Sequence, residues 1–315
     1  MQGKLALIFP GQGCQKVGMG ADCYQAFVES REVFAHADEI LGFSLSKLCF
    51  EGPEEQLFDT ANAQPAIYTA TCAMWKALEP RFADALPQVA FCAGHSLGEF
   101  SALAAAGAMS FEDGLRLVRC RGEAMRDAGA QAPGGMAALI GLDDATVAEV
   151  VAETNGDQDQ VWVANYNSPG QVVIAGERAA LERASTLATA RGAKRAVPLA
   201  VSVACHTPLM GAASERLAAA LNETTFHRPW APIISNVLAA PVQEPEEIRA
   251  ALLRQLTSPV RWVESVQAMA QQGVTAMIEI GPGAVLASLV KRIARALEVT
   301  SITDAAGIQG FNGGA

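Results

Sequence analysis

The chain has 315 residues, of which 50% are hydrophobic, so it can bury the core of one large domain or of two medium ones. Its formal net charge of −10 argues against a nucleic-acid partner, which requires a basic surface. Its apolar runs are far shorter than the roughly 20 residues of a membrane-spanning helix, and the apolar stretch before Pro10 is too short for a signal peptide. We therefore expect a soluble cytoplasmic protein without a membrane partner.

The cysteines point to no structural role beyond packing. Seven cysteines form an odd set without a C-x-x-C pair, and they share no clustered spacing with histidine. This pattern indicates neither a disulfide framework nor a structural zinc site. We predict a protein of a reducing compartment that holds no metal ion.

The first part of the chain is typical of an α/β protein. LALIFP at 5–10 and QVAFCAG at 88–94 predict buried strands, each followed by a sharp turn. An Ala-rich helix over 97–107 follows the second strand. The next helix begins after Ser110, which has an acid three residues later as in a capping box, and it ends near Gly129.

Between about 131 and 202 the pattern changes to strand, helix, strand, strand, helix, strand. This β-α-β-β-α-β order is that of a ferredoxin-like unit. We place it as a subdomain inserted into a larger α/β core formed by 1–130 and 203–315, which resumes with a helix after His206. The Gly-rich tail over 307–315 predicts disorder.

A G-x-S-x-G motif lies where the second strand turns into its helix, as Gly94-His95-Ser96-Leu97-Gly98. This is the setting of a nucleophile elbow. Small residues at both ends permit the strained turn, and the Leu97 amide at the helix N-terminus can stabilise an oxyanion. A chance glycine-rich turn is the alternative, but the strand-to-helix setting favours Ser96 as a nucleophile.

A serine nucleophile needs a base, and the chain has four histidines. His95 adjoins the nucleophile and is expected to point away from it, whereas His36 and His227 lie in charged or polar segments typical of the surface. His206 ends an apolar stretch and precedes a Thr-Pro pair, which is a strong helix start. We predict His206 as the base, kept neutral by the helix dipole. The alternative is a core histidine with satisfied hydrogen bonds.

Arg121 is the second unusual residue. It shares a helical stripe with Leu117 and Met125, which places it on the core side of its helix. A buried arginine needs an anion. A structural ion pair with a nearby acid such as Glu123 or Asp127 would satisfy it, and so would the carboxylate of a substrate. The spacing alone leaves both possibilities open.

Six segments, in order over nearly the whole chain, resemble malonyl-CoA:acyl-carrier-protein transacylases. They are FPGQGCQKVGMG, GHSLGEFSAL, RGEAM, NSPGQVVIAG, the His206 region and IEIGPGAVL. The resemblance implies an α/β-hydrolase-like core with the inserted ferredoxin-like subdomain. It also implies transfer of a malonyl group from malonyl-CoA to the phosphopantetheine thiol of acyl carrier protein, through a Ser96 acyl-enzyme with ping-pong kinetics, for fatty-acid or polyketide synthesis. No cofactor is implied, because malonyl-CoA and phosphopantetheine are substrates.

By position, the resemblance implies Ser96 as the nucleophile, His206 as the base and Arg121 as the arginine that binds the malonyl carboxylate. It also implies that the main-chain carbonyl of Gln255 orients the histidine. The further implied positions are the oxyanion-hole amides of Gln12 and Leu97 and the pocket-lining side chains of Gln64, Met125, Asn165 and Asn167. The alternative for Gln64 and the two asparagines is that they are turn residues.

Three departures from the family pattern concern residues near these positions. Cys14 stands where serine is expected after the PGQG turn, and Phe100 replaces a usual tyrosine. The segment Val203-Ala204-Cys205 before the base also differs. None of the three removes a catalytic atom, although the last one bears on the choice between malonyl and larger extender units.

Carrier proteins are acidic as a class and so is this chain, which means that docking needs a local basic patch. Lys291 and Arg292 are our candidates, with Arg191, Lys194 and Arg195 behind them, and the alternative for both groups is an ordinary solvated face. We expect a monomer.

The rival functions are a serine hydrolase and a carrier-protein scaffold without activity. A hydrolase of this kind usually has an HGGG-type loop, which the chain lacks.

Overall fold

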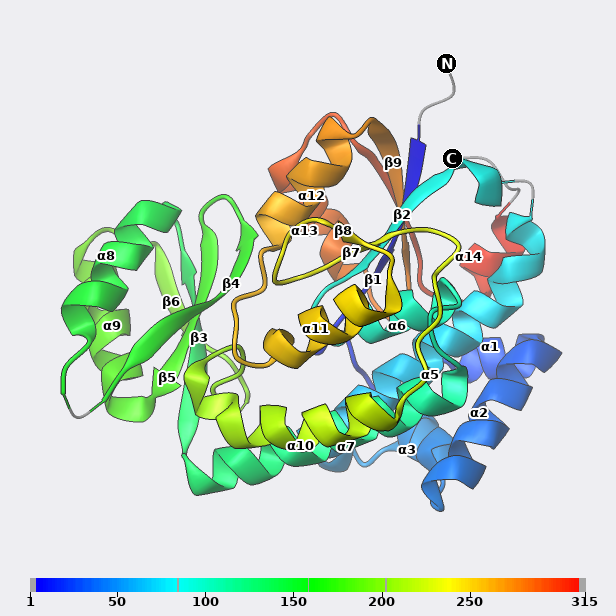
Figure 1. The fold of residues 1–315 in the computed structure, drawn as a ribbon, viewed down its shortest axis with the longest axis horizontal. Helices are drawn as coiled ribbons and strands as arrows, with labels where there is room; N and C mark the ends of the chain where they lie inside the picture. The colour runs from blue at the N-terminus through cyan, green and yellow to red at the C-terminus, as the bar shows by residue number, and fades with distance from the viewer. Residues whose placement is uncertain (1–3, 84, 158, 202, 312–315) are drawn as a thin grey trace.

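The protein is built on two sheets, seen in a computed structural model that describes residues 4–311 except 84, 158 and 202 (Figure 1). The larger sheet lies in the middle of the molecule with helices against it. The smaller sheet lies at one end, on the left of Figure 1, with two helices on its outer side. No described helix combines the length and the apolar character needed to cross a membrane.

The larger sheet has the strand order β10-β9-β1-β2-β7-β8. Its strands are β1 (Lys4–Phe9), β2 (Val89–Gly94), β7 (Ile233–Ile234), β8 (Pro241–Val242), β9 (Val274–Ile280) and β10 (Glu298–Ile302). The pairs from β10 to β7 are parallel, and β8 pairs antiparallel with β7. The carboxyl ends of the parallel strands therefore meet at one edge of the sheet.

The central strand β1 is buried on both faces, as parallel strands between helix layers are. Its alternate residues Leu5, Leu7 and Phe9 join the core under α5 (Thr60–Leu78), because successive side chains of a strand point to opposite faces. Ala6 and Ile8 join a second core formed with α12 (Trp262–Gln271) and α13 (Val285–Ile293). The sheet is thus the middle of three layers.

The smaller sheet has the order β4-β5-β3-β6, and all its pairs are antiparallel. Its strands are β3 (Gly134–Ile140), β4 (Val161–Ser168), β5 (Gln171–Glu177) and β6 (Arg195–Pro198). Two helices, α8 (Asp144–Thr154) and α9 (Arg178–Ala190), bury a separate apolar core against it. The element order is the β-α-β-β-α-β order that the sequence predicts for 131–202.

The other helices surround the larger sheet. They are α1 (Ala21–Ala26), α2 (Val28–Leu41), α3 (Leu45–Glu51), α4 (Glu54–Phe58), α6 (Gly98–Ala105), α7 (Phe111–Gln131), α10 (Gly211–Glu223), α11 (Pro245–Gln255), α14 (Ala305–Gly310) and the 3₁₀ turns Glu79–Phe82, Leu86–Gln88 and Pro208–Met210. The long helix α7 begins where the sequence predicts, since Ser110 Oγ accepts from the Asp113 amide at 3.0 Å. It packs between α5 and α10 along the lower side of Figure 1.

The prediction of disorder over 307–315 is wrong for its first part. Residues up to Gly310 form α14, because the Asp304 carboxylate accepts from the Gly307 amide at 2.7 Å and caps the helix. Phe311 then stacks on Phe82, with ring centroids 4.9 Å apart. Residues 312–315 lie outside the described residues.

Candidate active site

Several connections converge at the carboxyl edge of the larger sheet, where open α/β sheets bind ligands. The PGQG turn follows β1, the Ser96 motif follows β2 and Asn236 follows β7. The first two lie in direct contact, since a Cβ on Gly11 would be 2.2 Å from the His95 carbonyl oxygen. The backbone at this edge is therefore closely packed around Ser96.

Ser96 lies at a strained turn between β2 and α6. Its φ of 51° is in the left-handed region, which residues other than glycine rarely adopt. The flanking glycines are required by space: a Cβ on Gly94 would lie 1.9 Å from the Gly98 carbonyl carbon, and one on Gly98 would lie 2.1 Å from the Phe9 carbonyl oxygen. The strand-turn-helix geometry of a nucleophile elbow is present at Ser96.

Asn236, which the sequence reasoning missed, holds this turn in place. Its Nδ2 donates to the Gly94 carbonyl at 2.7 Å, and its Oδ1 accepts from the Ser96 amide at 2.6 Å. The side chain is fully buried. The positive φ of Ser96 costs the folded state about 1–3 kcal/mol, and such a conformation persists where surrounding contacts hold it. The signal that could have identified Asn236 is its position two residues after the buried strand β7.

His206 is in hydrogen-bonding distance of the Ser96 hydroxyl. Its Nε2 lies 2.8 Å from Ser96 Oγ, and its Nδ1 lies 2.8 Å from the main-chain carbonyl oxygen of Gln255. Because a carbonyl oxygen only accepts, Nδ1 carries the ring proton and Nε2 is left to accept the serine proton. Gln255 is the last residue of α11, where carbonyls have no partner within the helix. A helix end thus supplies the group that orients the ring.

The imidazole of His206 is neutral because its surroundings disfavour the charged form. Burial, followed by the positive charge of Arg121, lowers the pKa of His206 from 6.5 to about 3. Thr207 accepts from the Leu209 amide at 3.3 Å and caps the 3₁₀ turn Pro208–Met210, which runs directly into α10. The helix start predicted after His206 is therefore present. That its dipole also disfavours the imidazolium stays a prediction.

Arg121 lies beside both residues and is 1% exposed. Its Nη1 donates to Gln64 Oε1 at 2.8 Å. Its Nη2 donates to Ser96 Oγ at 3.0 Å and to Gln255 Oε1 at 3.1 Å. These acceptors are all uncharged, and Nε has no hydrogen-bond partner among the described residues. Burial lowers the pKa of Arg121 to about 10, so the guanidinium is still charged at neutral pH.

The acids near Arg121 in sequence bind other cations. Glu123 pairs with Arg119 at 2.7 Å and with Arg216 at 2.9 Å, and Asp127 also pairs with Arg216 at 2.9 Å. Among the ion pairs of the described residues, none involves Arg121. The predicted alternative of an ion pair with Glu123 or Asp127 is wrong. A buried charge without a carboxylate partner is costly, which suits a site that receives an anion.

Gln64 and Met125 lie on the two helices that hold Arg121. Gln64 is fully buried in α5, and its Nε2 lies 3.1 Å from the sulfur of Met125 in α7. The helices come this close at Gly122, where a Cβ would lie 2.6 Å from the Thr60 carbonyl oxygen. Both predicted pocket residues therefore contact the site, and neither lies in a turn.

Glu99 is a buried carboxylate that the sequence reasoning also missed. It is 2% exposed in α6, and its Oε2 accepts from Gln255 Nε2 at 2.7 Å and from the Asn236 amide at 3.3 Å. Burial raises its pKa to about 7, although hydrogen bonds and Arg121 act in the opposite direction. Its position directly after the G-x-S-x-G motif was the available signal.

The other predicted residues lie around this centre. Leu97 is the N-cap residue of α6, and Gln12 follows β1 with its Nε2 donating to Thr60 Oγ1 at 3.2 Å. Asn167 Oδ1 lies 2.8 Å from Nε2 of His95, which therefore points away from the nucleophile as predicted. Asn165 forms a bridge with Val260. Among the described residues, neither asparagine is hydrogen bonded to Ser96, His206 or Arg121.

The basic residues predicted for docking are exposed. Lys291 and Arg292 lie in the last turn of α13, and Arg292 donates to Gln171 Oε1 at 3.0 Å. Arg191 pairs with two acids of α8, Glu149 and Glu153, which offset its charge. Arg191 is therefore the weaker candidate, and docking by the other basic residues stays a prediction.

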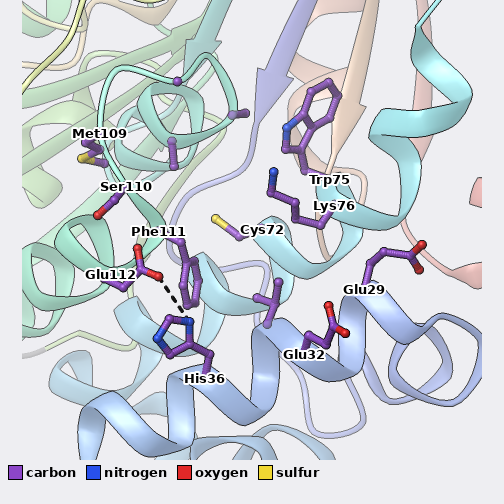
Figure 2. Close-up of a pocket in the computed structure, with 14 residues that line it drawn as sticks. Glu29, Glu32, His36, Cys72, Trp75, Lys76, Met109, Ser110, Phe111 and Glu112 are labelled. Atoms are coloured by element: carbon purple, nitrogen blue, oxygen red, sulfur yellow. Dashed lines mark ion pairs between the residues drawn. The ribbon is translucent and has the colours of Figure 1, made fainter.

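A cavity of about 550 Å³ lies at the end of α6 that is far from Ser96 (Figure 2). In Figure 2 the side chains of Cys72, Trp75 and Lys76 lie on one side of it, opposite an ion pair between His36 and Glu112 at 3.3 Å. None of the predicted site residues lines this cavity. It is separate from the arrangement around Ser96.

Sequence comparisons match this chain to acyltransferases over nearly its whole length. The sequence model of the family described as acyl transferase domain matches residues 6–309. The chain is 45% identical over 303 residues to the malonyl CoA-acyl carrier protein transacylase of Haemophilus influenzae, covering 96% of each chain. It is 44% identical over 301 residues to the protein of the same name from Bacillus subtilis, covering 96% of this chain and 94% of that one.

Solved structures give the same result. An acyl carrier protein S-malonyltransferase from Vibrio cholerae superposes with a TM-score of 0.92 at 45% identity, covering 97% of this chain and 99% of that one. A malonyl-transacylase in complex with a type II PKS acyl-carrier protein has a TM-score of 0.93 at 43% identity, covering 97% and 98%. The likeness therefore extends over the fold as well as the sequence.

Proposed function

This chain belongs to the acyl transferase domain family and is an acyltransferase, and we propose that it transfers a malonyl group from malonyl-CoA to the phosphopantetheine thiol of acyl carrier protein. The observation that carries the choice of malonyl is Arg121, a buried guanidinium beside the Ser96 hydroxyl with uncharged partners. A malonyl group has a thioester at one end and a carboxylate at the other, so it reaches both residues. The carrier protein in the complex of the similar transacylase supports the second substrate.

The first half-reaction forms an acyl-enzyme on Ser96. His206 Nε2 takes the hydroxyl proton as Ser96 Oγ attacks the thioester carbonyl carbon, and the main-chain amides of Leu97 and Gln12 hold the oxyanion. The carbon–sulfur bond then breaks, and coenzyme A leaves as a thiol with the proton from His206. The Gln255 carbonyl at the end of α11 stabilises the imidazolium between these steps.

The malonyl carboxylate affects this chemistry through Arg121. The positive charge of Arg121 contributes to the low pKa of His206. A bound carboxylate neutralises that charge, and so it raises the basicity of His206 when the substrate is in place.

In the second half-reaction the phosphopantetheine thiol attacks the Ser96 ester and gives its proton to His206, which returns it to Ser96. The kinetics are ping-pong, and the product is an extender unit for fatty-acid or polyketide synthesis.

Intact mass spectrometry tests this function. Mixing the protein with malonyl-CoA is expected to add one malonyl group, mapped to Ser96, and adding holo acyl carrier protein is expected to remove it. Ser96→Ala is the control and should gain no mass. Release of free malonate without carrier protein would indicate a serine hydrolase instead, and an unchanged mass would indicate an inactive scaffold.

We expect Lys291 and Arg292 to guide the carrier protein, because oppositely charged surfaces speed encounter. Reversing both charges, as Lys291→Glu with Arg292→Glu, should raise the KM for carrier protein and leave acylation by malonyl-CoA unchanged. Arg31 and Lys47, which are exposed and belong to neither predicted docking group, offer a matched control for the change in net charge. Equal effects on both half-reactions would remove these two residues from the docking surface.

The fold suggests the same family architecture. We infer an α/β-hydrolase-like core over 1–130 and 203–315, supported by the parallel sheet with a nucleophile elbow after β2. The order β6-β3-β5-β4 with two helices on one face supports a ferredoxin-like subdomain over 131–202. The Ser96 motif lies in the first part and Asn167, which contacts it through His95, in the second.

A further inference from the structure

The side chain of Gln255 lies at the centre of the site and makes three hydrogen bonds. Its Nε2 donates to Glu99 Oε2 at 2.7 Å and to the Ser96 carbonyl at 3.1 Å. Its Oε1 accepts from Arg121 Nη2 at 3.1 Å. The main chain of the same residue accepts from His206. One residue therefore joins the base, the nucleophile turn, Arg121 and a buried carboxylate.

Glu99 acts together with the Ser96 carbonyl and Arg121 to fix which way this amide is turned. Glu99 Oε2 already accepts from the main-chain amide of Asn236, so it acts as an acceptor, and the NH₂ group of Gln255 faces it while the Gln255 oxygen faces Arg121. If the amide turned over, its NH₂ group would point at the guanidinium and leave a buried donor beside a positive charge. That arrangement is costly in a buried site. Glu99 thereby keeps an uncharged acceptor in front of Arg121.

Glu99 also contacts the turn of the nucleophile. The amide of Asn236 donates to the same Oε2 at 3.3 Å, and the Asn236 side chain holds Gly94 and Ser96. Glu99 is not within hydrogen-bonding distance of Arg121 itself, and so it aligns the guanidinium without pairing with it. The charge of Arg121 is left for a ligand carboxylate.

We propose that Glu99 is a positioning residue that orients Arg121 through the Gln255 amide and so sets the preference for a malonyl over an uncharged acyl group. This proposal rests on malonyl transfer as the function. Glu99 does not touch the acyl group. Its influence is on the alignment of the guanidinium, which matters to malonyl-CoA and not to acetyl-CoA.

Replacing Glu99 with alanine is expected to lower the ratio of kcat/KM for malonyl-CoA to that for acetyl-CoA by about 10- to 100-fold, the equivalent of one charged hydrogen bond. Glu99→Gln is the conservative variant. Two amides donate to one oxygen of residue 99, so a glutamine there is held with its carbonyl toward them and keeps both bonds. Its ratio should stay within about threefold of the unchanged protein.

Two more variants separate positioning from stability. Gln255→Leu keeps the main-chain carbonyl but removes the amide, so it should lower the ratio like Glu99→Ala, and combining the two should add no further loss. It also tests the proposal if Glu99→Ala does not fold. Glu279 is a buried carboxylate that binds the first turn of α13 instead, and Glu279→Gln should lower the melting temperature with an unchanged ratio.

The outcomes are distinct. A lowered ratio in Glu99→Ala and Gln255→Leu, retained in Glu99→Gln, supports the proposal. An unchanged ratio in either of the first two, or additive losses in the double variant, overturns it. Failure of the proposed function looks different, because the unchanged protein itself would then show no preference for malonyl-CoA.

Discussion

Replacing His206 with alanine is expected to slow the acylation of Ser96 by malonyl-CoA about 10²–10⁴-fold, the usual contribution of a positioned general base. The imidazole Nε2 lies 2.8 Å from Ser96 Oγ, and its other nitrogen is held by a backbone carbonyl. Without the ring, no group at that position accepts the serine proton. The measurement is the rate of malonyl adduct formation in a single turnover, followed by intact mass.

A matched variant guards this result against a folding defect. His206 has a φ of 62°, a conformation that asparagine tolerates better than alanine. His206→Asn should therefore lose as much acylation as His206→Ala with a smaller fall in melting temperature. The dyad also predicts that no carboxylate is equally important. One Asp or Glu whose amide variant loses as much activity as His206→Ala, with an unchanged melting temperature, would overturn the dyad.

Much of the fold can be predicted from local patterns, because they reflect local physical requirements. The strand before Gly94 and the helix after it follow from apolar runs and a turn that only small residues allow, and the clashes at Gly94 and Gly98 show why. The cap at Ser110 depends on residues only three positions apart. The helix at 305–310 was missed although its cap, Asp304, is local, and its first amide, that of Ala305, also donates to the distant Asp22 carboxylate at 2.7 Å.

The site is harder to predict, because its polar residues act through partners far away in the chain. Ser96 and His206 are recognisable from their own surroundings. Asn236 and Glu99 have only a local position as a signal, and their roles become clear once three segments meet. The neutral state of His206 was predicted from a neighbouring helix start, but burial and a cation 85 positions earlier in the chain, which the sequence does not reveal, also lower its pKa. Burial and long-range charge are tertiary properties, and periodicity does not contain them.

Replacing Arg121 with alanine is expected to invert the preference between malonyl-CoA and acetyl-CoA. The change removes charged hydrogen bonds to the malonyl carboxylate, each worth about 1.5–3 kcal/mol, so kcat/KM for malonyl-CoA should fall at least ~10²-fold. Acetyl-CoA has no carboxylate to lose. Two effects favour it in the variant: the unpaired buried charge disappears, and the pKa of His206 rises because Arg121 no longer lowers it. Acetyl transfer should therefore stay constant or increase.

The two kcat/KM values and the melting temperature together decide what Arg121 does. Its contacts with Gln64, Gln255 and Ser96 could in principle serve only to hold α5, α7 and α11 together. Replacing a residue with that role would lower the melting temperature and would lower kcat/KM for both substrates alike. Arg119, two positions earlier, is a matched control, since it binds the Ala61 carbonyl in α5 and Glu123 but not Ser96. Arg119→Ala should leave the substrate ratio unchanged, and the same unchanged ratio in Arg121→Ala, with a lowered melting temperature, would exclude carboxylate binding by Arg121.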